Sequence, residues 1–301
     1  MYNEKMEMIT CSHAPDLVRC QRLCASVDEF VEPEIRHTLV VPRRDLALFR
    51  PLQNQRRRVM AVQDVVPGNH RQLPFVNRLW VASQGLPIRG WIMQQITKLS
   101  ANFITDAELL VFADSDLQFV RPFNRSHVYR QGKLRLHSNP IAKEEGHHRN
   151  WHFRSSVLLG LPKRYHGSDH VGQLITWRSS VLTKLQAHVS EQLGRTWYKP
   201  VAHSLHFSEY VLYGVFAEQV LGLDDAGHET CSEPLVHGCW YHFQALELYR
   251  GEAKCKKESV AILLQSNIGL GSLQEERILA QARRAIGADN LDIQPEAHSL
   301  G

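Results

Sequence analysis

A short apolar run that ends on two carboxylates constrains this chain more than any other feature. Residues 108–116 read Glu-Leu-Leu-Val-Phe-Ala-Asp-Ser-Asp, so Asp114 and Asp116 directly follow a stretch typical of a buried strand. Open α/β sheets bind their ligands beyond the carboxyl ends of the strands. Carboxylates at that edge suit Mg²⁺ or Mn²⁺ that arrives with a diphosphate. A solvated turn that happens to contain two aspartates is the alternative.

Segments typical of strands and helices alternate in the first third of the chain. Residues 6–11, 36–41 and 58–62 predict strands, and residues 17–27 predict a helix after the first of them. Apolar residues recur at helical spacing over residues 90–103, just before the run that ends on the two aspartates. This alternation favours an α/β fold with a mostly parallel central sheet flanked by helices.

The pattern is less regular in the second half of the chain. Short paired strands are predicted at 128–130 and 133–137, and further strands at 172–177 and 260–264. Helices are predicted over 150–161, 179–193, 206–220 and 273–286. We expect one large domain over residues 1–270, followed by a C-terminal helix and polar tail over residues 271–301.

Composition narrows the class of protein. With 301 residues, 43% of them hydrophobic and 22% charged, the chain can bury a sizeable core. Its formal charge of +4 favours small anionic ligands and argues against nucleic acid, whose binding proteins concentrate charge in a recognisable module. We expect no transmembrane segment and a cytoplasmic location, because no apolar run is long enough and the N-terminus lacks a signal-peptide core. The six cysteines form no Cys-x-x-Cys pair, so reduced thiols are expected.

Six short motifs carry a family resemblance. They are Ser-His-Ala-Pro-Asp at 12–16, Val-Pro-Arg-Arg-Asp-Leu at 41–46, Arg-Gly-Trp at 89–91 with Gln94, Gln95 and Lys98, Phe-Ala-Asp-Ser-Asp at 112–116 with Arg-Pro-Phe at 121–123, Val-Gly-Gln-Leu-Ile-Thr-Trp at 171–177, and Phe-Ser-Glu-Tyr at 207–210. In this order they resemble a largely uncharacterised bacterial family grouped with the GT-A-fold nucleotide-diphospho-sugar glycosyltransferases. The resemblance covers residues 6–270.

The resemblance implies a GT-A-like single domain and a metal-dependent, hexosyltransferase-like activity. Such an enzyme moves a sugar from a nucleoside diphosphate sugar to a hydroxyl of an acceptor, either a glycan or a small molecule. The resemblance also implies that Asp114 and Asp116 hold Mn²⁺ or Mg²⁺ against the donor diphosphate, where the cation neutralises charge on the leaving group. A late histidine often completes such a site, and His237 and His242 are the candidates. A core or surface role is the alternative for both, since the chain has 17 histidines.

Donor contacts are predicted on the helix before the Asp-x-Asp motif and at the end of the first strand. Lys98 is expected to contact a phosphate and Gln95 a base or sugar hydroxyl, with a solvated helix face as the alternative. By analogy of fold, the end of the first strand lies near the base and ribose. The predicted donor-binding residues are Thr10, Ser12, Arg89, Gln94, Gln95, Lys98, Asp114 and Ser115.

Two carboxylates are the candidates for catalysis. Asp169 follows a glycine in a predicted loop and is a candidate base for the acceptor hydroxyl in an inverting transfer. Glu209 lies on a predicted helix, where it either acts in catalysis, orients a hydroxyl or caps another segment. The sequence leaves both inversion and retention open.

Two other functions compete with glycosyl transfer. A nucleotidyltransferase also holds Mg²⁺ with paired aspartates, but it normally carries a Gly-rich loop with a basic residue after its first strand. Here that turn reads Ser-His-Ala-Pro at residues 12–15. A catalytically silent module that binds a sugar or nucleotide is the second alternative.

Overall fold

The computed structural model describes residues 4–73, 79–82, 87–140, 146–253, 256 and 258–291. Five strands form its central sheet: β1 (Met6–Cys11), β2 (Arg36–Val41), β3 (Arg57–Ala61), β7 (Leu109–Phe112) and β11 (Ile175–Arg178). Their order is β11-β7-β1-β2-β3. β7, β1, β2 and β3 are parallel, and β11 joins β7 as an antiparallel edge strand. The predicted α/β fold with a mostly parallel central sheet is therefore confirmed.

Helices cover both faces of this sheet. Successive side chains of β1 point to opposite faces, and those on each face pack in a different apolar cluster. Met8 packs in one cluster with Leu23 and Val27 of α1 (Leu17–Phe30). Ile9 packs in a second cluster on the other face. That second cluster includes residues of α4 (Gly90–Leu99), α5 (Gly146–Leu159), α6 (Ser179–Leu193) and α8 (Glu209–Val215). The aspartates after β7 therefore follow a strand that is buried on both faces.

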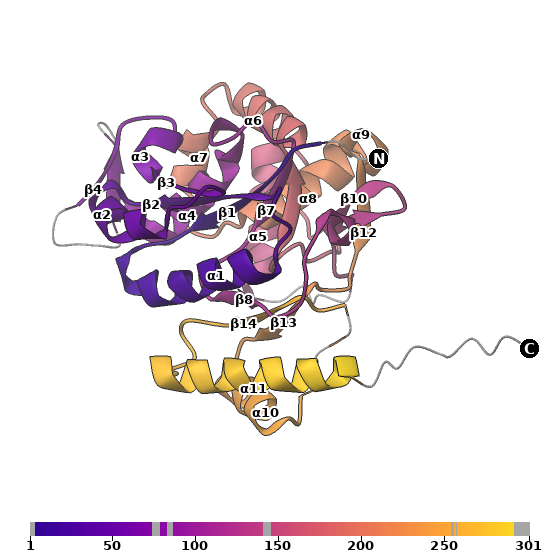
Figure 1. The fold of residues 1–301 in the computed structure, drawn as a ribbon. Helices are drawn as coiled ribbons and strands as arrows, with labels where there is room; N and C mark the ends of the chain where they lie inside the picture. Colours follow the sequence, from indigo (N-terminus) through magenta and orange to yellow (C-terminus); the bar gives the residue numbers. More distant parts are fainter. Residues whose placement is uncertain are drawn as a thin grey trace, which may run out of the picture.

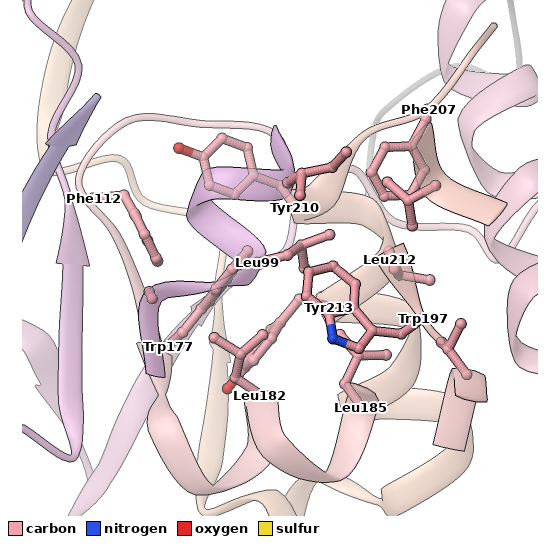
Figure 2. Close-up of a cluster of buried hydrophobic side chains, with 14 of the residues drawn as sticks. Leu99, Phe112, Trp177, Leu182, Leu185, Trp197, Phe207, Tyr210, Leu212 and Tyr213 are labelled. Carbon is pink, nitrogen blue, oxygen red and sulfur yellow. The ribbon is translucent and has the colours of Figure 1, made fainter. Parts of the chain in front are cut away.

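Aromatic packing fixes α8 against the edge of the sheet. The rings of Trp177 and Tyr213 are stacked with centroids 4.5 Å apart, and Phe112 meets Trp177 edge-on at 4.6 Å. The Tyr213 hydroxyl also accepts a hydrogen bond from the backbone nitrogen of Arg178. Figure 2 shows that the hydroxyl of Tyr210 points away from the rest of this apolar cluster. The start of α8 is thereby held beside the sheet, and the Tyr210 hydroxyl lies outside the apolar cluster, where it accepts a hydrogen bond from Lys98.

Three small sheets surround the central one. The first joins β9 (Tyr129–Arg130), β10 (Lys133–His137) and β12 (His228–Cys231), and its β9–β10 hairpin confirms the predicted strand pair. The second joins β8 (Leu117–Phe119), β14 (Ala261–Leu264) and β13 (Val236–Cys239). The third joins β4 (His70–Gln72), β5 (Leu79–Ala82) and β6 (Ile88–Arg89). Only part of the second sheet, and none of the third, was predicted.

The C-terminal helices pack beneath the second small sheet (Figure 1). Ile278 and Leu279 of α11 (Ser272–Leu291) pack in one cluster with Ile262 of β14 and with residues of α10 (His242–Arg250). The predicted helix over 273–286 is confirmed, whereas the domain boundary at residue 270 stays a prediction. The end of the predicted polar tail, residues 292–301, lies outside the described residues. None of the described helices combines the length and apolarity needed to cross a membrane.

Element ends differ from the predictions where the backbone leaves regular geometry. The predicted helix over 206–220 begins three residues later, and a π-helical turn over Phe216–Leu221 follows α8. The strand predicted over 172–177 begins only at Ile175, because Leu174 adopts a positive φ of 54°. The remaining short helices are α2 (Leu46–Phe49), α3 (Val62–Val65), α7 (Tyr198–Ala202) and α9 (Leu223–Ala226).

Candidate functional site

Asp114 stands two residues after β7, at the carboxyl edge of the parallel strands. Its Oδ1 lies 3.1 Å from the ammonium nitrogen of Lys98, and its Oδ2 accepts a hydrogen bond of 3.0 Å from Nε2 of Gln173. Lys98 comes from α4 and Gln173 from the loop before β11. Both oxygens of this carboxylate are therefore already engaged by groups from two different elements.

Lys98 is at the centre of a buried polar cluster. Its side chain is almost entirely buried, and its nitrogen lies 3.2 Å from Glu209 Oε1 and 2.7 Å from the Tyr210 hydroxyl. Burial favours the neutral amine, but the charges of Asp114 and Glu209 outweigh burial and hold the pKa of Lys98 well above its usual value. Lys98 is thus a buried cation between two carboxylates, and a solvated helix face is excluded for this residue.

Glu209 joins α4 to α8. Its backbone nitrogen, one of the unpaired donors at the start of α8, donates to Oε1 of Gln95 at 3.0 Å. Burial raises the pKa of the Glu209 carboxyl, although the Lys98 ammonium opposes that shift. Nε2 of Gln95 is buried with no hydrogen-bond partner among the described residues. The structure therefore places Gln95, a predicted donor-binding residue, in contact with Glu209, a catalytic candidate.

Asp116 faces a different neighbourhood from Asp114. Its Oδ2 accepts a hydrogen bond of 3.2 Å from the backbone nitrogen of Ser266, in the loop after β14. Burial, together with the charge of Asp114, raises the pKa of the Asp116 carboxyl to about 7. Between the two aspartates, the Ser115 hydroxyl donates to the hydroxyl of Ser12 at 2.9 Å. The motif is therefore tied to the end of β1, where donor contacts were predicted.

For several predicted site residues, no contact with Lys98 or with the two aspartates is seen among the described residues. Thr10 is fully buried, and its hydroxyl bonds to the ring of buried His37 at 3.0 Å. Oδ1 of Asp169 accepts a hydrogen bond from the backbone nitrogen of Val171 and lies 3.4 Å from Nδ1 of His148. Arg89 is exposed at the start of α4, and Gln94 is half-buried on that helix. The predicted roles of these four residues stay predictions.

The two late histidines lie in the C-terminal part of the fold. His237 shares a face of β13 with Cys239, which packs against α10 and α11, because alternate residues of a strand share a face. Burial lowers the pKa of His237. His242 is exposed at the first position of α10. The described residues include no group of three or more His, Cys, Asp or Glu side chains arranged to hold a metal ion. A histidine ligand therefore stays a prediction.

Sequence reasoning missed Gln173 and Tyr210, which both contact the site. Gln173 lies in the strand predicted over 172–177, and Tyr210 in the helix predicted over 206–220, and neither was predicted as a site residue. A polar amide inside the otherwise apolar run over residues 171–177 was the available signal for Gln173.

Comparison with known proteins places the chain in a family. Residues 7–281 match the model of DUF6492, which is described as a family of unknown function. The chain belongs to the DUF6492 family. No curated protein matches this DUF6492 chain significantly. This membership agrees with the predicted resemblance to an uncharacterised family.

One solved structure similar to the DUF6492 chain is an active-site mutant of the protein LgtC. The two sequences are 12% identical, the alignment covers 92% of this chain and 95% of LgtC, and the TM-score is 0.45. At this identity and TM-score the similarity is too low to indicate an activity.

Proposed function

We propose that this DUF6492 protein is a metal-dependent glycosyltransferase that moves a sugar from a nucleoside diphosphate sugar to an acceptor hydroxyl. The observation that carries the proposal is the position of Asp114 and Asp116 beyond the end of β7. Ligands of open α/β sheets bind at this carboxyl edge. The six motifs that resemble the GT-A glycosyltransferases support the same reading, and five of them, the motif of the aspartates included, contribute residues to these contacts.

The residues present fit a hard divalent cation. Mg²⁺ usually binds proteins through one or two carboxylates and takes its other ligands from water and substrate phosphates. Burial of Asp116 beside Asp114 disfavours two free negative charges, and this is the condition that a bound cation relieves. When bound, the cation stabilises the charge that develops on the departing nucleoside diphosphate.

The contacts assign different roles to the two aspartates. Asp116 is the carboxylate that would hold the cation, since within the described part of the chain its side chain accepts hydrogen bonds from backbone nitrogens, that of Ser266 among them, and has no ion pair with a basic residue. Asp114 already forms an ion pair with Lys98 and a hydrogen bond with Gln173, so it is suited to orient the ribose or sugar of the donor. Lys98, predicted as a phosphate contact, instead positions Asp114 and Glu209 in this proposal.

A ligand screen tests the proposed function. Thermal unfolding is followed with UDP-glucose, UDP-N-acetylglucosamine, GDP-mannose and dTDP-glucose, each with and without Mn²⁺, because a ligand that binds only the folded state raises stability. We expect at least one donor to stabilise the protein in a Mn²⁺-dependent way, and to be hydrolysed slowly or transferred. Stabilisation only by nucleoside triphosphates, with release of pyrophosphate, would instead identify a nucleotidyltransferase. Donor binding without turnover would identify a silent binding module.

A further inference from the structure

A cavity of about 210 Å³ is lined in part by Gln173, the residue that bonds to Asp114. It is enclosed by β10, the start of β11 and the segment 233–240, and its polar lining includes Arg135, His137, Gln173, Thr176, Glu233 and Trp240. Gln173 connects the cavity to the candidate site, because its Nε2 donates to Asp114. A group bound in this cavity would therefore lie one side chain away from the Asp-x-Asp motif.

The carbonyl end of Gln173 has no bonding partner within the described chain. Its Oε1 is buried without a hydrogen-bond donor, while its Nε2 is held by Asp114. Buried polar atoms in native proteins are nearly always paired, so an unpaired acceptor in a cavity lining calls for a ligand donor or a water. A hydroxyl group is a donor of the right kind.

The backbone next to Gln173 is strained. Leu174 has a φ of 54°, a conformation that costs free energy for any residue other than glycine. The Leu174 side chain is buried in the apolar cluster that also contains Leu235 and Val236, and this packing holds the strained turn in place. Strain of this kind is concentrated at binding and catalytic sites, where it fixes the direction of a neighbouring side chain.

Trp240 adds a flat apolar surface to the same cavity. The indole lies against Gly238: a Cβ at that glycine would come within 2.6 Å of the indole Nε1. The Trp240 side chain is 39% exposed although the residue lines the cavity, so the indole forms part of its rim. A sugar ring has apolar C–H faces that pack on aromatic rings and a circle of hydroxyls that need donors and acceptors.

The charges that line the cavity and its volume limit the class of ligand that it can hold. Arg135 and Glu233 contribute one positive and one negative charge to the lining, and burial lowers the pKa of His137, which keeps this ring neutral at pH 7. The lining therefore favours a neutral group over an anion. The volume is below the roughly 300–1,000 Å³ of sites for drug-sized ligands, so a single ring fits and a complete nucleotide sugar does not.

We propose that this cavity is a subsite for one neutral sugar ring, packed on Trp240 and hydrogen-bonded to Gln173. The inference rests on the proposed glycosyl transfer and extends it. Two sources supply the same ring chemistry: the sugar carried by the donor and the sugar of the acceptor. The experiment separates them.

The test compares Trp240→Ala and Gly238→Ala with the control Phe243→Ala. Gly238→Ala displaces the indole without removing it, whereas Phe243 is 57% exposed and does not line the cavity. Binding of the methyl glycosides of glucose, galactose and N-acetylglucosamine is titrated by saturation-transfer NMR. Calorimetry measures the affinity ratio between each of the four nucleotide sugars and its own nucleoside diphosphate. Circular dichroism checks that every variant is folded.

For an acceptor ring, methyl glycoside affinity falls about tenfold in both Trp240→Ala and Gly238→Ala and is unchanged in Phe243→Ala. For a donor ring, the affinity gained from the sugar disappears in the same two variants while nucleoside diphosphate affinity is kept. Glycoside binding that neither variant weakens, together with an unchanged donor ratio, overturns the inference, as does a wild-type protein that binds no sugar. Trp240-dependent glycoside binding without any nucleotide binding would refute the proposed function and leave the subsite standing.

Discussion

The Lys98 ammonium lies 3.1 Å from Asp114 and 3.2 Å from Glu209, and so holds together two carboxylates from opposite sides of the site. Asp114 follows β7, whereas Glu209 is the first residue of α8. All three side chains are buried or half-buried. In such surroundings, removal of one charge costs far more than the net value of the pair, because the remaining charges stay buried without compensation.

We therefore expect Lys98→Met to lower the free energy of unfolding by about 3 kcal/mol at pH 7. The two carboxylates would then face each other without a cation. Urea denaturation measures the effect. Lys5→Met is the matched control, since Lys5 and Asp106 form an exposed ion pair with side chains 66% accessible. Its change should stay below about 1 kcal/mol. Equal losses in the two variants would refute a structural role for Lys98.

Glu209→Gln should partly rescue the Lys98→Met variant. The second substitution removes one of the two uncompensated carboxylates but keeps the shape of the side chain. A double-mutant cycle should show a coupling of at least about 1 kcal/mol between the two sites, as for residues in direct contact. Additive losses would mean that the two charges do not interact in solution.

Asp116→Asn should weaken Mn²⁺-dependent binding of a nucleoside diphosphate by at least about tenfold. The side chain keeps its shape but loses the charge that attracts the cation. Calorimetric titration with and without Mn²⁺ measures the loss, and Asp106→Asn serves as an exposed control. Metal-dependent binding that survives in Asp116→Asn would remove this residue from the cation site.

Because of His228, the free energy of unfolding should decrease as the pH is lowered through the acid range. Burial lowers its pKa to about 4, and its ring bonds to the Tyr213 hydroxyl at 2.8 Å and to the Leu134 carbonyl at 3.1 Å. The folded state disfavours the protonated ring, so the stabilisation is complete above the unfolded pKa of about 6.5 and is lost as pH falls toward 4. His228→Gln should reduce the slope of the free energy of unfolding against pH in this range by the amount that corresponds to about one proton. An unchanged slope would contradict the assignment.

Glu275 should anchor the C-terminal helix. It is buried, and Oε1 accepts a hydrogen bond of 2.7 Å from Nη2 of Arg19, while Oε2 pairs with Arg22. We expect Glu275→Ala to lower the free energy of unfolding by about 2–3 kcal/mol, because two arginines of α1 lose this buried carboxylate, although Arg19 keeps its contact with Asp16. The adjacent exposed Glu276 provides the control. A similar loss in Glu276→Ala would show that helix propensity, and not the ion pairs, causes the effect.

The central sheet was predictable because burial on two faces leaves a direct mark in the sequence. Residues 6–11 and 36–41 are segments of strand length that contain mostly apolar or β-branched residues, and the helix over 179–193 carries its apolar residues at regular spacing. The β4–β5–β6 sheet had no such mark, since β4 consists of His-Arg-Gln. Short polar strands are specified by their partners and not by their own pattern.

The candidate site was predictable only in part. The Asp-x-Asp motif was visible because an apolar run ends on it. The phosphate contact predicted for Lys98 stays a prediction, whereas its ion pairs with Asp114 and Glu209 were not predicted. Helical periodicity separates polar from apolar faces, but it does not show that a polar face is buried against distant carboxylates. The partner Glu209 lies on another helix far along the chain. Contacts of this kind depend on tertiary packing, which local sequence pattern does not encode.

The link from Ser266 to Asp116 spans 150 residues of sequence, and the link from Glu275 to Arg19 spans 256. The ribosome synthesises Asp116 well before Ser266, and Ser266 before the residues of α11. The Asp-x-Asp turn of a nascent chain therefore lacks the hydrogen bond from Ser266 until residue 266 has left the exit tunnel. The proposed cation site is accordingly completed only after residue 266 has been synthesised.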